Sequence, residues 1–292
     1  MFKSSSWKHL RITFSYYLMP IFWFALALSP DWSMLHIILV WTALHLFLYP
    51  SSNGYNSYFD KDEESIGGLK NPPKVTLGLY YLSLLFFAVA LGLALLVNFP
   101  FFSMVMIYGL VSMAYSHPSI RLKKYAYTSW MTAGFFQGCF TLLMCYVGLN
   151  GSGWVVWTEL EVLVPGMLTT LLLLGSYPLT QIYQHQEDGM RGDRTLSLRL
   201  GVMGTFNFSS IWFMVAGMGF AKYFFDKNEE WAFWAFLLAM LPVVLYFFFW
   251  WMLAKNNEKE YVNHTMAMWM NKLSGTALNI FFLYYTYQLH LL

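Results

Sequence analysis

Residues 77–98 read LGLYYLSLLFFAVALGLALLVN, an apolar run that contains no charged side chain. A helix of about 20 such residues is long enough to cross the roughly 30 Å of hydrocarbon in a bilayer. The composition points the same way, because 58% of the 292 residues are hydrophobic and only 11% are charged. An ordinary soluble domain has roughly 25% charged residues. The sequence therefore predicts a membrane protein, and the lack of porin-type strand alternation predicts that it is all-α.

Eight further segments have similar length and hydropathy, so we expect a polytopic bundle of about nine transmembrane helices around a central cavity. The expected spans are residues 10–29, 34–51, 77–98, 100–116, 126–149, 162–184, 203–224, 231–253 and 273–290. The first span follows basic residues and ends in ALALS, a pattern that also occurs in signal peptides. We interpret it as an uncleaved helix, because its apolar run is long and further spans follow at once.

Basic residues are distributed very unevenly between the two ends of these spans. Of the 17 Lys and Arg residues, all but Lys222 and Lys227 lie at the N-terminus or in the even-numbered interhelical loops. The positive-inside rule places that side in the cytoplasm. We therefore expect an integral multi-pass protein of the cell (inner) membrane, with a cytoplasmic N-terminus and an outside C-terminus.

Two acidic clusters lie at this predicted cytoplasmic side. They follow the second and sixth spans and consist of Asp60, Asp62, Glu63, Glu64 and of Glu187, Asp188, Asp193. If the second span continues as a helix, Asn56, Asp60 and Glu64 project from one face, because residues four apart stack on a helix. Clustered carboxylates repel unless a cation compensates, and Mg²⁺ is usually bound by one or two carboxylates together with substrate phosphates. The pattern favours a metal-bound diphosphate between two helices, while a solvated loop end is the plain alternative.

A basic loop lies between the two clusters along the chain. Residues 115–124 read YSHPSIRLKK and carry Arg121, Lys123 and Lys124 on the same predicted side. Arg can bind phosphate oxygens through two parallel hydrogen bonds, and Lys acts as a point charge. The positive-inside rule alone would also put basic residues here, so the loop by itself leaves both interpretations open.

Residues 56–64, NSYFDKDEE, resemble the first signature of the UbiA superfamily of intramembrane prenyltransferases, N-D-x-x-D-x-x-x-D. Asn56, Asp60 and Glu64 stand at its three key positions, whereas Ser57 and Glu64 replace residues that are usually Asp. GGLKNPP at 67–73 resembles the polar connection that follows this motif in the family. YSHPSIRLKK is similar to the family's basic loop after the fourth helix.

Residues 184–201, QHQEDGMRGDRTLSLRLG, are similar to the second family signature, D-x-x-x-D followed by Gly and a T-L-x-x-x-L-G run. Asp188 takes the place of the second Asp, and Gln184 that of the first. A Gln oxygen can ligate a cation but brings no charge. Either Glu187 or Asp193 therefore takes part, or this half of the metal site is weaker.

The resemblance implies an enzyme that moves an isoprenoid chain from an allylic prenyl diphosphate to an aromatic or lipid-like acceptor, in quinone or lipid biosynthesis. It implies Mg²⁺ as cofactor, held by Asn56, Asp60, Glu64 and Asp188. It implies catalytic roles for Asp60, Asp188, Arg121 and Lys123. The implied substrate-binding residues are Asn56, Lys124, Lys70, Gln184 and Asp193. The expected partners are this donor, a hydrophobic or aromatic acceptor and the lipid bilayer, with no nucleic acid.

A weak internal repeat supports one membrane-embedded domain over residues 1–292. Spans two and six end in acidic motifs, and spans four and eight end near basic or amide-rich loops, so we expect helices one to four and five to eight to surround one cavity, with the ninth outside the repeat. A secondary transporter with a carboxylate-coupled ion site is the alternative. Transporters more often place such carboxylates near the bilayer midplane. A CDP-alcohol phosphotransferase is disfavoured because its D-G-x-x-A-R core is absent.

Overall fold

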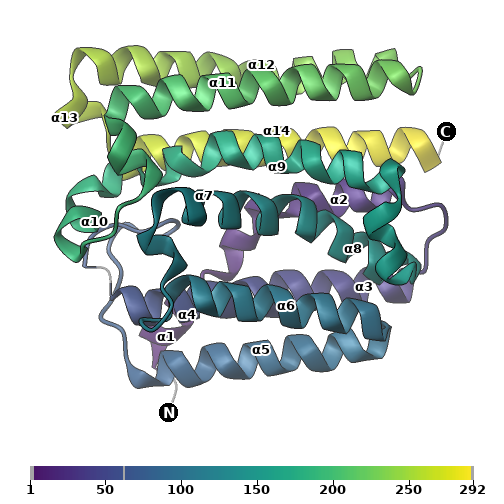
Figure 1. Ribbon diagram of the computed structural model, residues 1–292, viewed down its shortest axis with the longest axis horizontal. Helices are drawn as coiled ribbons and strands as arrows, with labels where there is room; N and C mark the ends of the chain where they lie inside the picture. Colours follow the sequence, from purple (N-terminus) through teal and green to yellow (C-terminus); the bar gives the residue numbers. More distant parts are fainter. Residues whose placement is uncertain (1–2, 62, 291–292) are drawn as a thin grey trace.

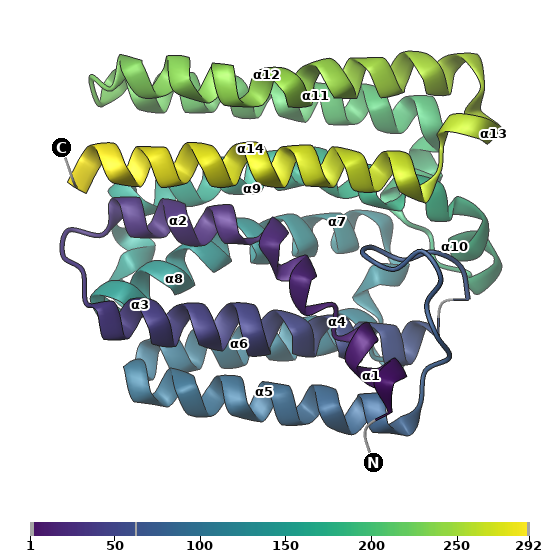
Figure 2. The same cartoon turned by 180° about the vertical axis from the view of Figure 1, so that it is seen from behind.

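The computed structural model describes residues 3–61 and 63–290, and this part of the chain is a bundle of long helices without a β-strand (Figure 1). The all-α prediction is confirmed. Most of the long helices run parallel or antiparallel to one another along the longest axis of the molecule (Figures 1 and 2).

The helices divide into long elements and short turns between them. The first half comprises α1 (Ser4–His9), η1 (Ile12–Tyr17), α2 (Met19–Leu28), α3 (Met34–Trp41), η2 (Thr42–Leu48), α4 (Tyr49–Asp60), α5 (Leu77–Val97), α6 (Phe99–Ser116), η3 (Leu122–Lys124), α7 (Ala126–Phe135), η4 (Phe136–Phe140) and α8 (Thr141–Asn150). The second half comprises η5 (Gly153–Thr158), α9 (Leu160–Gln181), η6 (Ile182–Gln184), α10 (His185–Arg191), α11 (Leu196–Asp226), α12 (Glu230–Asn256), α13 (Glu258–Tyr261) and α14 (His264–His290). Elements η2 and η4 are π-helical and run on without a break into α4 and α8.

Within the described residues, seven helices are long and apolar enough to cross a membrane. They are Met34–Asp60, Leu77–Val97, Phe99–Ser116, Ala126–Asn150, Leu160–Arg191, Leu196–Asp226 and Glu230–Asn256. Each coincides with a predicted span, including the short and interrupted spans 34–51 and 100–116. An eighth follows if the bent pair Ser4–Tyr17 and Met19–Leu28 counts as one span, while α14 is long enough but less apolar. The predicted count of about nine is therefore approximate.

The first span is broken by a bend of 44° between η1 and α2. Pro20 lies in the first turn of α2, where its missing N–H removes no hydrogen bond. Asn279 of α14 bonds across this break: its Nδ2 donates to the Tyr16 carbonyl (3.2 Å), and its Oδ1 accepts from Trp23 Nε1 (3.0 Å). Neighbouring polar groups of this kind allow a broken helix inside a bilayer. Part of the polarity of α14 is therefore explained by its position beside the first span (Figure 2).

Replacing Asn279 by Leu should destabilise the protein by about 1–3 kcal/mol, because the Tyr16 carbonyl and the Trp23 indole would lose their partner inside the bundle. Thermal unfolding of the detergent-solubilised protein measures this effect. Asn207→Leu, at an exposed position of α11, makes the same chemical change and should leave the melting temperature close to that of the parent. Equal melting temperatures for all three proteins would contradict this role of Asn279.

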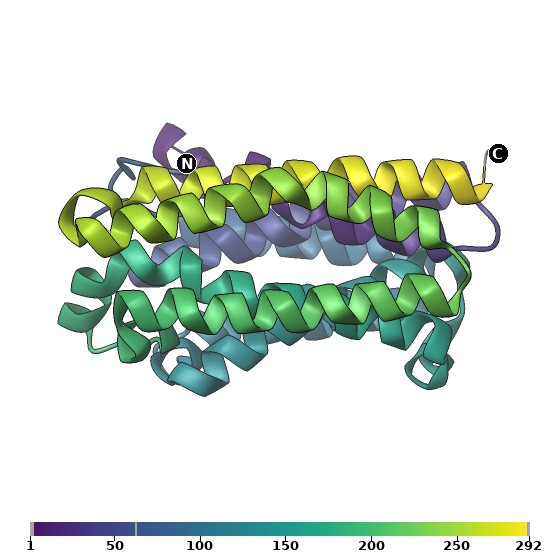
Figure 3. The ribbon, with the colours of Figure 1, turned by 90° about the horizontal axis from the view of Figure 1, so that it is seen from above.

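The helices pack around two large apolar clusters. The larger includes Phe22, Phe24, Phe101 and Phe220, and the smaller includes Phe206 and Trp250. The first and last spans are neighbours, because α2 packs along α14. Helices α11 and α12 also pack against each other (Figure 3). The C-terminal ends of α4 and α6, the start of α7, and α10 all lie at one end of the bundle (Figure 1). We call this the motif end, because both acidic segments and the basic loop are there.

Candidate active site

A cavity of about 290 Å³ opens at the motif end, between α4, α6, α7 and α9. Six of the predicted site residues line it, namely Asn56, Asp60, Lys123, Gln184, Asp188 and Asp193. They come from segments that lie far apart in the chain: the first is Asn56 and the last is Asp193, more than 100 residues later. The fold thus brings both acidic motifs and the basic loop to one space.

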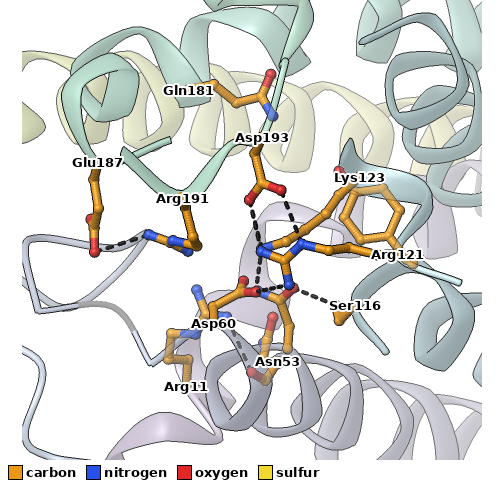
Figure 4. A network of polar contacts seen from close by, with 12 residues as sticks. Arg11, Asn53, Asp60, Ser116, Arg121, Lys123, Gln181, Glu187, Arg191 and Asp193 are labelled. Atoms are coloured by element: carbon orange, nitrogen blue, oxygen red, sulfur yellow. Dashed lines mark hydrogen bonds and ion pairs between the residues drawn. The ribbon is translucent and has the colours of Figure 1, made fainter. Parts of the chain in front are cut away.

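Two carboxylates and two cations form a compact ion-pair network at the wall of this cavity (Figure 4). Arg121 donates from Nε and Nη2 to the two carboxylate oxygens of Asp193, at 3.0 and 2.8 Å. Lys123 donates to Asp60, and its Nζ lies 3.8 Å from Asp193 Oδ2. The side chains of Asp60 and Asp193 are only 5% and 3% exposed, so removing either cation would leave a buried carboxylate without its partner.

The basic loop is held in place by its backbone. Arg121 has a left-handed conformation (φ 47°), and its N–H donates to the His117 carbonyl at 2.8 Å. The Arg194 N–H donates to the Lys124 carbonyl at 3.2 Å, which joins the basic loop to the loop after α10. The hydrogen bonds to Asp193 raise the pKa of Arg121 above its ordinary value, so the guanidinium stays protonated. The two loops therefore hold a protonated Arg121 in the ion-pair network at the cavity wall.

The first acidic motif contributes two residues to the cavity. Asn56 and Asp60 are one turn apart on α4, and Ser116 Oγ donates to Asn56 Oδ1 at 2.5 Å. The helix ends at Asp60, because Lys61 turns left-handed (φ 52°) and its N–H caps the Ser57 carbonyl at 3.0 Å. The helical face expected to include Glu64 therefore stops short of it: Glu64 is exposed and does not line the cavity. Asp62 lies outside the described residues.

The second acidic motif contributes Asp188, which is buried at the cavity wall. Its Oδ2 accepts from the Thr195 hydroxyl at 3.4 Å, and its carbonyl accepts from the Asp193 N–H at 3.0 Å. Of the two residues considered as substitutes for a first Asp, Asp193 lines the cavity and Glu187 does not. Glu187 instead pairs with Arg191 at 2.9 Å. The negative charge on this side is therefore supplied by Asp188 and Asp193.

Two glutamines, Gln181 and Gln184, also line the cavity. Gln184 Nε2 donates to the Ser65 carbonyl at 3.2 Å. Gln181, which the sequence analysis missed, donates from Nε2 to the Tyr177 hydroxyl at 3.2 Å, and that hydroxyl bonds to the hydroxyl of Tyr115. The Gln181 Oε1 is buried and has no hydrogen-bond partner among the described residues. This oxygen is therefore available to a ligand in the cavity.

Comparison with known proteins identifies the family. Residues 17–273 match the sequence model of the UbiA prenyltransferase family. The chain belongs to this family. No curated protein sequence matches the chain.

Solved structures agree with the UbiA family in fold. A UbiA homologue from Archaeoglobus fulgidus bound to DMAPP and Mg²⁺ is 14% identical, with a TM-score of 0.69 over 98% of this chain and 99% of that one. A UbiA homologue from Archaeoglobus fulgidus bound to GPP and Mg²⁺ is 15% identical, with a TM-score of 0.68 over 99% of this chain and 100% of that one. A digeranylgeranylglyceryl phosphate synthase is 16% identical, with a TM-score of 0.61 over 99% and 98%. At these identities the likeness establishes the UbiA fold, in an integral membrane protein.

Besides Glu64, three predicted site residues of this UbiA family member do not line the cavity. Arg121 reaches its wall only through its ion pairs with Asp60 and Asp193. Lys70 and Lys124 are exposed and do not line the cavity.

Conversely, Arg11 lines the cavity, although the sequence analysis counted it only among the basic residues of the N-terminal side. Its Nη1 donates to the Gly67 carbonyl at 3.0 Å and its Nη2 to the Asn53 carbonyl at 3.4 Å. No pattern in the sequence links this cation to the glycine loop at 67–73, and only the tertiary structure joins them.

The cavity donors fit a hard divalent cation. They are carboxylate oxygens of Asp60, Asp188 and Asp193 and amide oxygens of Asn56, Gln181 and Gln184, and no His or Cys lines the cavity in the described part of the chain. No three described His, Cys, Asp or Glu residues lie close enough to form a complete metal site by themselves. Mg²⁺ is usually bound by one or two carboxylates, with water and substrate phosphates as the other ligands. The donor set suits that mode of binding.

Proposed function

We propose that the protein transfers a prenyl group from an allylic prenyl diphosphate to a hydrophobic or aromatic acceptor, within quinone or lipid biosynthesis. The observation that carries the proposal is one cavity lined by Asp60, Asp188, Asp193 and Lys123, with Arg121 paired to Asp193 at its wall. Carboxylates that can hold a cation and cations that can bind phosphate are the two requirements of a metal diphosphate site. The two structures of the Archaeoglobus homologue, with GPP and with DMAPP, contain prenyl diphosphates together with Mg²⁺.

Asn56, Asp60 and Asp188 are the residues that would hold Mg²⁺, and Gln184 and Gln181 can add neutral oxygens. When bound, the ion supplies Lewis-acid stabilisation of the charge that develops on the departing diphosphate. Asp193 contributes less directly, because both of its oxygens are engaged by Arg121.

Arg121 and Lys123 have two sets of possible partners. Without substrate they neutralise Asp60 and Asp193, which would otherwise be buried and unpaired. When a cation and a diphosphate enter, the carboxylates can turn to the cation and the basic side chains to phosphate oxygens. Cations held at this wall can then stabilise the charge that develops on the leaving diphosphate.

The reaction then has a simple balance. The allylic C–O bond breaks, and its electron pair leaves with the diphosphate, whose charge Arg121 and Lys123 neutralise. The allylic cation that remains forms a bond with the nucleophilic atom of the acceptor, which loses a proton. Tyr108 and Phe136 line the cavity on its inner side, where ring faces can stabilise a cation and exclude water.

Topology follows from the same charges. We place the N-terminus and the motif end in the cytoplasm, with the C-terminus outside, because the basic residues gather on that side. We treat residues 1–292 as one domain whose spans one to four and five to eight form two halves around the cavity. In support, α4 and α6 of the first half and α7 and α9 of the second half line the cavity. The transporter alternative loses support, since the carboxylates are at helix ends and already paired with phosphate-binding cations.

Removal of Mg²⁺ should abolish turnover. The purified protein in detergent, given C10 to C20 prenyl diphosphates and a panel of aromatic acceptors, should release diphosphate and form a prenylated product only with Mg²⁺. With EDTA the rate should fall to that of the buffer without protein, because the bound cation offsets the charge of the leaving group. Diphosphate release that is equal with Mg²⁺ and with EDTA would contradict the metal-dependent mechanism. Lack of release with every donor would contradict the proposed function.

A further inference from the structure

The cavity extends from the motif end along α4 and α6, and its inner wall carries polar groups among apolar side chains such as Val111 and Phe136. Five residues of α4, α6, α7 and η4 carry hydroxyl or amide groups there, and we call them the inner subsite: Ser52, Tyr108, Ser112, Thr132 and Gln137. Ser52 precedes Asp60 by eight residues on α4, which at 1.5 Å per residue places it about 12 Å deeper. A chamber that held only the hydrocarbon tail of a prenyl donor would be expected to have an apolar wall at this depth.

Gln137 is the most unusual member of the inner subsite. The hydroxyls of Ser52 and Ser112 bond to each other. In contrast, neither the Gln137 amide nor the Thr132 hydroxyl makes a side-chain hydrogen bond within the described part of the chain. Polar side chains inside transmembrane helices are costly and usually have a partner. The amide therefore faces the cavity with its hydrogen-bonding groups available.

The backbone around Gln137 is built to present it to the cavity. Gln137 lies in the π-helical turn η4, and such turns are frequent at functional sites. The turn is pressed against α9: a Cβ on Gly138 would lie 2.6 Å from the Thr170 Cα, so only glycine fits there. The Cys139 N–H donates to Thr170 Oγ1 at 2.9 Å, which satisfies a donor in the widened turn. The helix contact with α9 thus fixes the direction of Gln137.

We infer that Gln137 is a specificity-determining residue that hydrogen-bonds the hydroxyl of a phenol-type acceptor ring in the inner subsite. This inference rests on the proposed function, because it concerns the acceptor of that reaction. A Gln amide both donates and accepts, so it can bind a hydroxyl group in either sense. Phe136 and Tyr108, whose ring centroids are 6.5 Å apart, line the same region and offer aromatic contacts to a ring. A donor tail placed here would leave the amide without a partner.

The test compares two probes that differ by one hydroxyl group, 2-naphthol and naphthalene, on the full-length protein in detergent. Gln137→Met keeps the side-chain length and removes the hydrogen-bonding groups. The dissociation constant of 2-naphthol should rise about tenfold in this variant, which is the loss of a hydrogen bond to a buried group. The dissociation constant of naphthalene should stay within about twofold, since its contacts are apolar. Partition of each probe into detergent is the same for parent and variant and cancels in the ratio.

Gln186→Met is the matched control, because Gln186 is exposed on α10 and does not line the cavity. It should bind both probes as the parent does. Thr132→Val is a second variant of the inner subsite and should weaken 2-naphthol alone, by a smaller factor. Parental affinity of Gln137→Met for 2-naphthol, or a parent protein that does not prefer 2-naphthol to naphthalene, would overturn the inference.

The proposed function is tested separately. Stabilisation of the protein by prenyl diphosphate with Mg²⁺ depends on the motif end and should be the same in Gln137→Met and in the parent. If the parent failed to release diphosphate with any donor, the proposed function would fall. Selective loss of 2-naphthol binding in Gln137→Met would still support the inner subsite in that case, so the two failures are distinguishable.

Discussion

Asp60→Asn should lower the rate of Mg²⁺-dependent diphosphate release by about a thousandfold, the upper range for loss of one preorganised electrostatic group. Asp60 lines the cavity beside Asn56 and forms the ion pair with Lys123. The substitution preserves size and removes only the charge that would hold the cation. It also leaves Lys123 free to bind phosphate, so donor affinity should fall less than the rate. Initial rates over a range of donor and Mg²⁺ concentrations separate the two effects.

The control for Asp60→Asn is Asp226→Asn. Asp226 is exposed at the C-terminal end of α11, where it pairs with Lys222, and the 31-residue helix separates it from the second acidic motif. This variant should have the activity of the parent. Gel filtration and thermal unfolding should show that Asp60→Asn is folded. A folded Asp60→Asn protein with more than about one tenth of the parental rate would contradict the assignment of Asp60 to the metal site, given the expected factor.

Arg121→Leu should both destabilise the protein and inactivate it. The variant leaves the carboxylate of Asp193, which is 3% exposed, without its bidentate partner. Breaking a buried ion pair by removing one partner costs about 3 kcal/mol. The same change removes a charge from the leaving-group site, which should lower the rate of diphosphate release about a hundredfold. Thermal unfolding and initial rates measure the two losses independently.

The double variant Arg121→Leu/Asp193→Leu separates structure from catalysis. Stability should return to near that of the parent, because a buried ion pair can often be replaced by apolar residues at little cost. Activity should stay low, since the guanidinium is still missing. Lys222→Leu, which breaks the exposed pair with Asp226, should change stability little. If the double variant regained both stability and activity, Arg121 would have a structural role only.

Much of the fold could be predicted from the sequence because it depends on local properties. In a bilayer, the backbone N–H and C=O groups of a run such as 77–98 must find hydrogen-bond partners within the protein. Only a helix supplies these partners from its own segment. The spans at 34–51 and 100–116 are short and interrupted, yet both lie inside long apolar helices. The Asn56 and Asp60 pair follows in the same way from the helical repeat of α4.

Helix ends were less predictable. The face through Asn56 and Asp60 would have continued to Glu64 if α4 were longer, but Lys61 takes a left-handed conformation and ends it. Lysine has no strong preference for that conformation, in contrast to glycine, so the sequence contains no clear stop signal there. Similarly, α14 is less apolar than a typical span, and its place in the bundle follows from contacts of Asn279 with the first span.

The sequence by itself determined that this is a membrane protein, where its spans approximately lie and which residues form its two acidic motifs. Each of these depends on composition or on spacing within one helix. Only the tertiary structure decided which charges meet. The pair of Arg121 with Asp193 joins residues 72 positions apart, and it selects Asp193 rather than Glu187 for the cavity. The approach of Gly138 to Thr170 and the direction of Gln137 depend equally on two packed helices. Such contacts are set by the packing of distant segments, and no local pattern encodes them.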